Sequence, residues 1–445
     1  MSFPSNVIQD SLSVQMTRAL RAKLLLCFCS LFFFSSLIVL YTLDISRNWY
    51  YMGFDLDADI KRIPLSALVI LWFCILSRDR SDLTSFFQGF LIFIVLCPAS
   101  VLFCMAGRTL DYYFVVISGC AAVFLTSSLP VPRVVSARLS GNQFAIALVF
   151  VATLVLITIA AFGGLRDFNL NILRVYEFRQ SAADRLPKVF GYIVSPVSKV
   201  IVPIGFTLGL YYKKRSIACA FAVMAVLLFG MTHHKTILFA PIFVLLTYFF
   251  LHKYSVRRGL LIIFVFVGCV ALLELIMMRV MGLTASGLLG TLIIRRVILV
   301  PSLLDSFYVD FFSDNAKILW SNSKVSLGLS ESSYDVTAPF LIGGEYFGRS
   351  EMSANTGFIG SGFANFGIVG VLMYGTLLGL LVAILNSHSR SLGHPLTVSM
   401  CIMIVMSAMT SSDLVTILLT HGLLLLIVCL SFMPSASEDR QGAMP

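Results

Sequence analysis

The sequence has little charge for its length. Of its 445 residues, 12% are charged, about half the roughly 25% that is typical of soluble domains. Apolar and aromatic residues make up 58%, against roughly 45–50% in soluble proteins. A chain this apolar cannot keep its apolar surface away from water in a soluble fold. The composition therefore excludes a soluble enzyme, a disordered chain and a nucleic-acid-binding domain, and it predicts an integral membrane protein.

The ten cysteines form neither a disulfide framework nor a zinc pattern. All lie in apolar runs or at their ends, and Cys27 and Cys29 are too close together for the usual zinc spacing. We interpret them as small buried apolar side chains. The alternating acids Asp55, Asp57 and Asp59 look like a cation site but lack the glycine and distal glutamate of an EF-hand. We therefore predict no metal site and no cofactor.

Long apolar runs fill most of the chain. A membrane-spanning helix needs about 20 mostly apolar residues, and a helix satisfies its own backbone hydrogen bonds in lipid. The runs are too long and lack the alternation of barrel strands. We predict an all-α polytopic membrane protein, a single integral membrane domain over 1–445. Its transmembrane helices number about twelve: 22–43, 63–77, 83–105, 112–129, 143–163, 191–211, 216–231, 236–251, 259–279, 360–386, 396–411 and 414–432.

The basic residues give these helices an orientation. One set of segments lies on the same side of the membrane as both ends: 1–21, 78–82, 130–142, 212–215, 252–258, 387–395 and 433–445. With Lys23 at the first boundary, this set holds fifteen Lys/Arg and five Asp/Glu, and the rest of the chain holds seventeen of each. The whole net charge of +10 is thus on one side, which the positive-inside rule assigns to the cytoplasm. Both termini are predicted to be cytoplasmic, with a disordered tail at 433–445.

The outer loop 164–190 is rich in arginine. It contains Arg174, Tyr176, Glu177 and Arg179. Arginine on the outer side runs against the charge bias, so it indicates an anionic partner. Arginine makes bidentate hydrogen bonds to phosphate, and a tyrosine can stack on a sugar ring. Binding to lipid head groups is the alternative.

The outer loop 280–359 contains an apolar stretch that Arg295 and Arg296 interrupt. Apolar residues with a basic pair predict a helix at the membrane interface, at the depth of lipid phosphates. Simple anchoring to the surface would also explain this pattern.

The turn from Thr232 to Lys235 joins two helices of about 16 residues each, roughly 24 Å long, so we expect it to be recessed below the outer surface. It carries His233 and His234. An imidazole is a natural general base near neutral pH, and Lys235 can bind a phosphate. An ordinary polar turn is the alternative.

Few ionisable residues lie within the predicted spans, where they are costly and commonly functional. Lys199 lies between Pro196 and Pro203, which predicts a kinked helix. Lys199, Glu274, Lys235, Asp413 and His421 all fall near the midplane or in the outer half, which indicates a polar cavity open to the outer face. Snorkelling or a structural pair is the alternative.

Several segments together resemble the Wzy-type O-antigen polymerases, also called oligosaccharide repeat unit polymerases. The most specific are 295–301, 308–312, 320–323, 353–360 and 364–367. The motif at 174–179 and the turn ending in Lys235 fall where these polymerases carry basic outer-face motifs. The detailed resemblance covers about a third of the chain, and the topology covers the rest.

The resemblance implies a GT-C-like helical core in the bacterial inner membrane. It implies that a growing glycan on undecaprenyl pyrophosphate is transferred en bloc to a new lipid-linked repeat unit on the periplasmic face. A polysaccharide chain-length regulator is a possible partner. By hypothesis, His234 or Glu177 is the base, and Tyr176 and Asn355 orient sugars or brace the cavity. The pyrophosphates are bound by Arg174, Arg179, Lys235, Arg295 and Arg296.

Three other functions remain open. An O-antigen ligase would share the scaffold and the leaving group. A metal-dependent GT-C glycosyltransferase would use Asp55 and Asp57. A lipid-oligosaccharide flippase would be expected to show two similar halves and short loops on both faces, and the sequence has neither.

Overall fold

The computed structural model describes residues 5–78, 80–132, 139–166, 168–172, 187, 189–321, 323, 326 and 331–433. This part of the chain is helical apart from its turns and loops and an isolated parallel bridge between Asp57 and Ala106. Ten helices in it are long and apolar enough to cross a membrane. The prediction of an all-α polytopic membrane protein is therefore confirmed.

The helices follow the predicted spans closely. Each of the ten long helices overlaps one predicted span, and the other two predicted spans correspond to the shorter apolar helices Arg62–Leu76 and His394–Thr410. The largest differences in length are at Ala19–Met52 and Phe358–Leu392, which extend well beyond the predicted ends. Helices continue past the apolar core because their ends can leave the lipid while the backbone hydrogen bonds continue.

The chain forms two compact units, each described here by itself. Unit 1 comprises residues 1–129, 257–380 and 409–411, and unit 2 comprises 130–256, 381–408 and 412–445. The single integral membrane domain expected from the sequence stays a prediction.

The helices of unit 1 surround one central segment. This segment runs from Leu83 to Met105 and is buried over its whole length. It consists of α4, the π-helical turn η3 and α5. Its last part, α5, packs against α1, α3, α6 and α14. The unit 1 elements are α1 (Ser5–Leu40), η1 (Tyr41–Ile45), α2 (Ser46–Trp49), η2 (Tyr50–Met52), α3 (Arg62–Leu76), α4 (Leu83–Leu91), η3 (Ile92–Leu96), α5 (Cys97–Met105), α6 (Leu110–Ser127), α13 (Val256–Val280), η7 (Gly290–Leu299), α14 (Val300–Asp314), α15 (Ala338–Phe347) and the first part of α16 (Phe358–Leu392).

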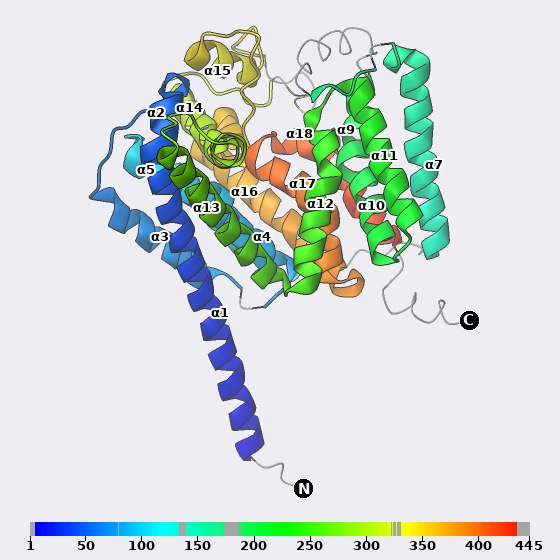
Figure 1. Ribbon diagram of the computed structural model, residues 1–445, viewed down its shortest axis with the longest axis horizontal. Coiled ribbons are helices and arrows are strands. Elements are labelled where there is room, and N and C mark those ends of the chain that lie inside the picture. The colour runs from blue at the N-terminus through cyan, green and yellow to red at the C-terminus, as the bar shows by residue number, and fades with distance from the viewer. Residues whose placement is uncertain are drawn as a thin grey trace. The chain divides into compact units, whose positions relative to one another are not determined.

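The predicted helix of the 280–359 loop is present as η7 followed by α14. Figure 1 shows α14 nearly end-on, whereas α1 and α13 run along the plane of the picture. Every residue from 301 to 309 is buried, so this part of the helix is packed on all sides. A helix lying on a membrane surface would keep one side exposed, so α14 is more enclosed than the sequence indicates.

Unit 2 contains helices that are interrupted within the predicted spans. A π-helical turn at Val197–Ile201 separates α9 from α10, at the place where the prolines on either side of Lys199 predict a kinked helix. A second interruption, at Thr420–Gly422, separates α18 from α19. The unit 2 elements are α7 (Gly141–Ile159), η4 (Ala160–Gly164), α9 (Val189–Pro196), η6 (Val197–Ile201), α10 (Val202–Tyr211), α11 (Arg215–Thr232), α12 (Lys235–Lys253), α17 (His394–Thr410), α18 (Leu414–Leu419), α19 (Leu423–Phe432) and the end of α16.

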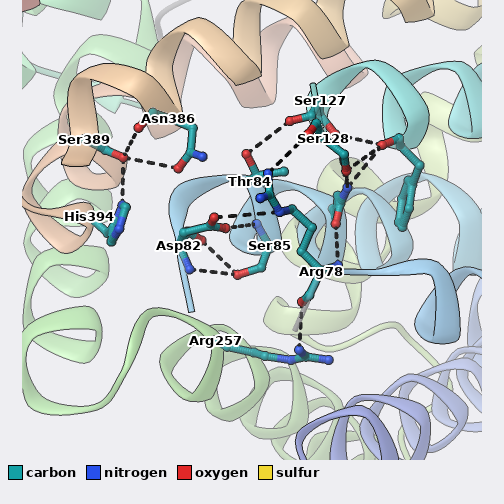
Figure 2. Close-up of polar contacts among 12 residues, drawn as sticks. Arg78, Asp82, Thr84, Ser85, Ser127, Ser128, Arg257, Asn386, Ser389 and His394 are labelled. Carbon is teal, nitrogen blue, oxygen red and sulfur yellow. Dashed lines mark hydrogen bonds and ion pairs between the residues drawn. The ribbon is translucent and has the colours of Figure 1, made fainter. Parts of the chain in front are cut away.

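In unit 1, two of the predicted cytoplasmic loops are joined by hydrogen bonds. Figure 2 shows Arg257, at the start of α13, donating to the backbone oxygen of Arg78 at 3.0 Å. Arg257 also donates to the Ser77 hydroxyl at 3.4 Å. Asp82 caps α4 by accepting from the Ser85 N–H at 2.9 Å. The buried guanidinium thus holds the 77–82 turn against the start of α13.

Candidate functional site

The segment from Gly290 to Asp314 is positioned by a carboxylate at its beginning. Glu274 on α13 accepts hydrogen bonds from the N–H groups of Leu289 and Gly290, at 3.1 and 2.9 Å. A carboxylate at a helix N-terminus satisfies unpaired donors and opposes the positive end of the helix dipole. Glu274, predicted from the sequence as a costly charge within a span, therefore fixes where η7 begins.

Arg295 is buried within unit 1 beside an aromatic ring. Its guanidinium carbon lies 3.7 Å from the centroid of the Trp49 ring, and Nη1 contacts the Met52 sulfur at 3.3 Å. The Nε atom is buried without a hydrogen-bond partner. Burial, and next the charge of Arg296, lower the pKa of Arg295. Among the described residues, no carboxylate forms an ion pair with this guanidinium.

The Trp49 ring has a defined orientation. Its Nε1–H donates to the Ser286 hydroxyl at 2.9 Å, and that hydroxyl donates to Asp44 at 2.7 Å. Asn48 donates to the same Asp44 oxygen at 2.8 Å. This chain of hydrogen bonds places the ring face against Arg295, and a cation over an aromatic face is attracted to it.

Arg108 joins α14 to the turn that follows Trp49. It forms an ion pair with Asp310 at 3.6 Å and donates to the Gly53 oxygen at 2.8 Å. Its guanidinium lies over the Phe307 ring, 5.0 Å from the centroid. Burial raises the pKa of Asp310, and Arg108 opposes this effect. The sequence analysis did not single out Arg108; its position in an outer connection, against the charge bias, was the available signal.

Asp305 connects α14 to the segment before α16. Its carboxylate accepts hydrogen bonds from the Thr356 hydroxyl and from the Gly360 N–H, the latter at 3.0 Å. The nearby Tyr308 hydroxyl donates to the Ala354 oxygen at 3.0 Å. Burial raises the pKa of Asp305 to about 7, and the two hydrogen bonds oppose the rise. Asn355 lies between these anchor points, with an exposed side chain.

Gly360 is required by this close approach. A Cβ at Gly360 would lie 2.6 Å from the Thr356 hydroxyl and 2.9 Å from the Asp305 carboxylate. The glycine therefore leaves the space that the carboxylate occupies.

The segments that follow α14 meet α16 in the same unit. Asn365 accepts a hydrogen bond from the Trp320 N–H at 2.9 Å, and the Trp320 ring N–H donates to the Tyr374 hydroxyl at 2.9 Å. The Ile318 N–H donates to the Ala364 oxygen at 2.9 Å. All the segments quoted for the resemblance therefore belong to unit 1: 295–301, 308–312, 320–323, 353–360 and 364–367. Hydrogen bonds join 308–312 to 353–360 and 320–323 to 364–367.

The turn with the adjacent histidines belongs to unit 2. Its helices are 18 and 19 residues long, longer than the roughly 16 expected. His233 is buried in a left-handed conformation, and its N–H donates to the Phe229 oxygen at 2.7 Å. His234 is exposed at the start of α12, and Lys235 is half-buried. Of the two imidazoles, His234 is thus the accessible one.

The described start of the 164–190 loop lies beside this turn. The Asn169 N–H donates to the Gly230 oxygen at 3.1 Å, and Phe168 packs so closely on Gly230 that a Cβ there would lie 2.3 Å from its ring. The candidate residues of this loop lie outside the described residues: Arg174, Tyr176, Glu177 and Arg179.

The alternating acids of the first outer loop have local structural partners. Asp59 forms an ion pair with Arg62 at 3.1 Å, and the Asp57 N–H donates to the Met105 oxygen at 2.9 Å. In the part of the chain that the structure describes, no group of three or more His, Cys, Asp or Glu side chains could hold a metal ion. All ten cysteines are free, and two of them, Cys219 and Cys269, are exposed rather than buried as expected.

Comparison with known proteins gives no relative. No family model matches the chain, no curated protein matches it, and no solved structure matches it.

Proposed function

We propose that this protein is a membrane glycosyltransferase of the O-antigen polymerase type. It joins undecaprenyl-pyrophosphate-linked oligosaccharide repeat units en bloc into a surface polysaccharide on the periplasmic face of the bacterial inner membrane. A hydroxyl at the non-reducing end of the new unit attacks the anomeric carbon of the growing chain. The bond from that carbon to the pyrophosphate breaks, and undecaprenyl pyrophosphate leaves.

The observation that carries this proposal is the environment of Arg295. A buried cation is costly unless an opposite charge compensates it, and no described carboxylate does so here. A guanidinium suits a phosphate group because its planar fork donates two parallel hydrogen bonds. A lipid pyrophosphate would supply the missing charge, while Trp49 holds the guanidinium plane. Arg296, exposed on the next position of η7, adds a second positive charge.

The other proposed roles rest on the residues of each unit separately. In unit 1, Asn355 orients a sugar, and the bonds from Asp305 and Tyr308 to its neighbours support this position. In unit 2, the exposed His234 accepts the proton of the attacking hydroxyl, with Glu177 as the alternative base. Tyr176 orients a sugar, and the second pyrophosphate is bound by Arg174, Arg179 and Lys235.

The test is polymerisation by the purified full-length protein in nanodiscs. Lipid-linked repeat unit is the sole substrate, without nucleotide sugar or ATP, and the reaction is run with and without a chelator. The proposal predicts a ladder of lipid-linked multimers that the chelator does not change. If no multimers form, the proposal is wrong.

Other outcomes identify the alternatives. Chelator-sensitive growth by single sugars would indicate a metal-dependent GT-C enzyme. Transfer of the glycan to a lipid A core would indicate an O-antigen ligase, and movement of the lipid across the bilayer without a new bond would indicate a flippase. A polysaccharide chain-length regulator is the proposed protein partner, and adding it would narrow the distribution of multimer lengths.

A further inference from the structure

A lysine lies near the middle of one membrane-spanning segment of unit 2. Lys199 is in the π-helical turn η6, within the candidate span Val189–Tyr211. Its side chain is half-buried. Among the described residues, no carboxylate forms an ion pair with Lys199 and no acceptor takes a hydrogen bond from its Nζ atom. An intramembrane charge is expensive and normally has a partner.

A histidine with two serine partners lies beside this lysine. His421 is at the interruption between α18 and α19, and its ring is bonded to Ser195, one helical turn before Lys199. The His421 Nδ1 atom is hydrogen-bonded to the Ser195 hydroxyl at 2.7 Å, and Nε2 to the Ser412 hydroxyl at 2.9 Å. Ser195 and Lys199 are four residues apart on neighbouring turns, so one stretch of helix supplies both groups.

The helix interruption is packed directly against the same stretch. Gly422 adopts a left-handed conformation, and a Cβ there would lie 2.9 Å from the Pro196 Cβ. The approach of these two backbones brings the ends of α18 and α19 to the level of Lys199. α19 begins at Leu423 and has no side-chain cap.

The hydrogen-bond capacity of the cluster leaves donors for a further acceptor. In a neutral imidazole one ring nitrogen accepts and the other donates. One serine hydroxyl therefore donates to the ring, and the other accepts from it and keeps its own O–H for another partner. The Lys199 ammonium adds up to three N–H donors. All four side chains are half-buried rather than sealed, so a ligand can reach them.

The direction of α19 adds to this positive environment. The N-terminus of a helix carries partial positive charge and free N–H groups. Interrupted membrane helices place such an N-terminus next to the anionic group of a substrate. Here the start of α19, without a side-chain cap, follows His421 with Gly422 between them.

We propose that Ser195, Lys199, Ser412 and His421 form a binding site for a phosphate-type oxyanion within the membrane-spanning part of unit 2. The anion compensates the positive charge of Lys199 and accepts a hydrogen bond from the serine hydroxyl that does not donate to the ring. The ligand is either inorganic phosphate or the phosphate of a lipid head group, because both present the same oxygens. The site does not depend on the proposed polymerase activity, since it shares no residue with the proposed catalytic set.

The test is equilibrium binding to the full-length protein in micelles of dodecyl maltoside, a detergent without a phosphate group that could compete for the site. One arm measures radiolabelled inorganic phosphate. The other measures retention of polyprenyl monophosphate by native mass spectrometry. The wild type is expected to bind one of these ligands saturably. Binding of inorganic phosphate identifies the free anion as the ligand, and binding of the polyprenyl phosphate alone identifies the lipid head group.

Three substitutions test whether the ligand binds at the proposed site. Lys199→Met is expected to weaken binding roughly tenfold or more, as loss of a charge-assisted hydrogen bond does. Lys199→Arg keeps the charge and is expected to retain most of the affinity. Lys253→Met, which removes one charge from an exposed position of the same unit, serves as the matched control and is expected to bind as the wild type does.

The proposal is overturned if neither ligand binds saturably, or if Lys199→Met and Lys253→Met bind alike. Size-exclusion elution of each variant checks its folding. If Lys199→Met does not fold, the variant Ser195→Ala/Ser412→Ala, which keeps both titratable groups, decides the question. Binding weakened several-fold in this variant supports the site, and unchanged binding contradicts it.

Discussion

At the scale of single residues, Asp305 and Arg295 show two ways in which unit 1 buries a charged group. Asp305 is surrounded by donors, the Thr356 hydroxyl and the Gly360 N–H. Arg295 contacts an aromatic face and a sulfur instead, and its Nε atom has no partner. The first arrangement stabilises a carboxyl group within the protein. The second leaves donors that a ligand can use.

The raised pKa of Asp305 predicts that the stability of the folded protein depends on pH. Burial raises its pKa to about 7 in the folded protein, against about 3.9 in an unfolded chain. The folded state therefore binds this proton more tightly, and the stabilisation is complete below about pH 4 and lost as pH rises through about 7. At about 1.4 kcal/mol per pKa unit, the loss is at most about 4 kcal/mol. The unfolding temperature of the wild type should fall between about pH 4 and pH 7.

Asp305→Asn is the matched variant for this prediction. An asparagine oxygen can still accept from Thr356 and Gly360 but does not titrate. The difference in unfolding temperature between the wild type and Asp305→Asn, measured by differential scanning fluorimetry, should change steadily across this pH range. Parallel profiles would show that Asp305 does not titrate there.

The sequence identifies which residues carry a suitable chemical group, but it does not show which of them are buried. Arg295 and Arg296 were both predicted as phosphate ligands, but only the fold shows that one is buried and the other exposed. The same holds for His233 and His234. Arg108 was missed because its partners Asp310 and Gly53 are far from it in the sequence.

At the scale of elements, the position of α16 depends on contacts made by backbone atoms. Gly357, just before α16, lies so close to the end of α17 that a Cβ would be 2.2 Å from the Met409 oxygen. Backbone cannot yield as a flexible side chain does. The segment that carries Asn355 is therefore held before Asn355 by the bond from Tyr308 to Ala354, and after it by Asp305 and by this contact.

Gly357→Ala should accordingly destabilise the protein. Forcing an extra methyl into a packed site typically costs about 1–3 kcal/mol. Gly344→Ala is the control, because the nearest atom to its added Cβ is 3.9 Å away and alanine favours a helix by up to about 1 kcal/mol over glycine. Thermal unfolding should be lowered for Gly357→Ala and unchanged or raised for Gly344→Ala. Equal unfolding temperatures would contradict the close contact.

Most helices were predictable because an apolar run of sufficient length has few alternatives in lipid. The interruptions within these helices are harder to predict from the sequence. The prolines around Lys199 predict a kinked helix, and the π-helical turn η6 lies at that place. The break at Gly422 instead depends on packing against Pro196, a contact that no local pattern reveals. The helix at 290–314 was predicted from its apolar and basic residues, but its burial follows from its contacts with α5, α6 and α15.

At the scale of the whole molecule, the two units carry different polar chemistry. Unit 1 holds the segments quoted for the resemblance, together with Arg295 and Asp305. Unit 2 holds the His233–Lys235 turn and the Lys199–His421 cluster. The basic start of α13 and the 77–82 turn lie together within unit 1, as expected if both belong to one side of the membrane.

The charge bias predicts which side that is. Lys253→Cys, at the end of α12, should be cytoplasmic, and Ser332→Cys, in the long loop before α15, should be periplasmic; both positions are exposed. A membrane-impermeant maleimide should label Ser332→Cys in cells whose outer membrane is permeabilised, and Lys253→Cys only after lysis. The parent protein controls for Cys219 and Cys269. The reverse pattern would invert the proposed orientation and move the candidate site to the cytoplasm.

The most direct test of the functional account is the affinity of the protein for undecaprenyl pyrophosphate. The wild type, Arg295→Met and Arg349→Met are compared in nanodiscs. Arg349 is an exposed arginine of the same unit and controls for the loss of one charge. If Arg295 binds the pyrophosphate, Arg295→Met should weaken binding by roughly 10- to 100-fold, the range for a lost charged hydrogen bond, while Arg349→Met binds normally. Equal affinity of Arg295→Met and the wild type would contradict the account.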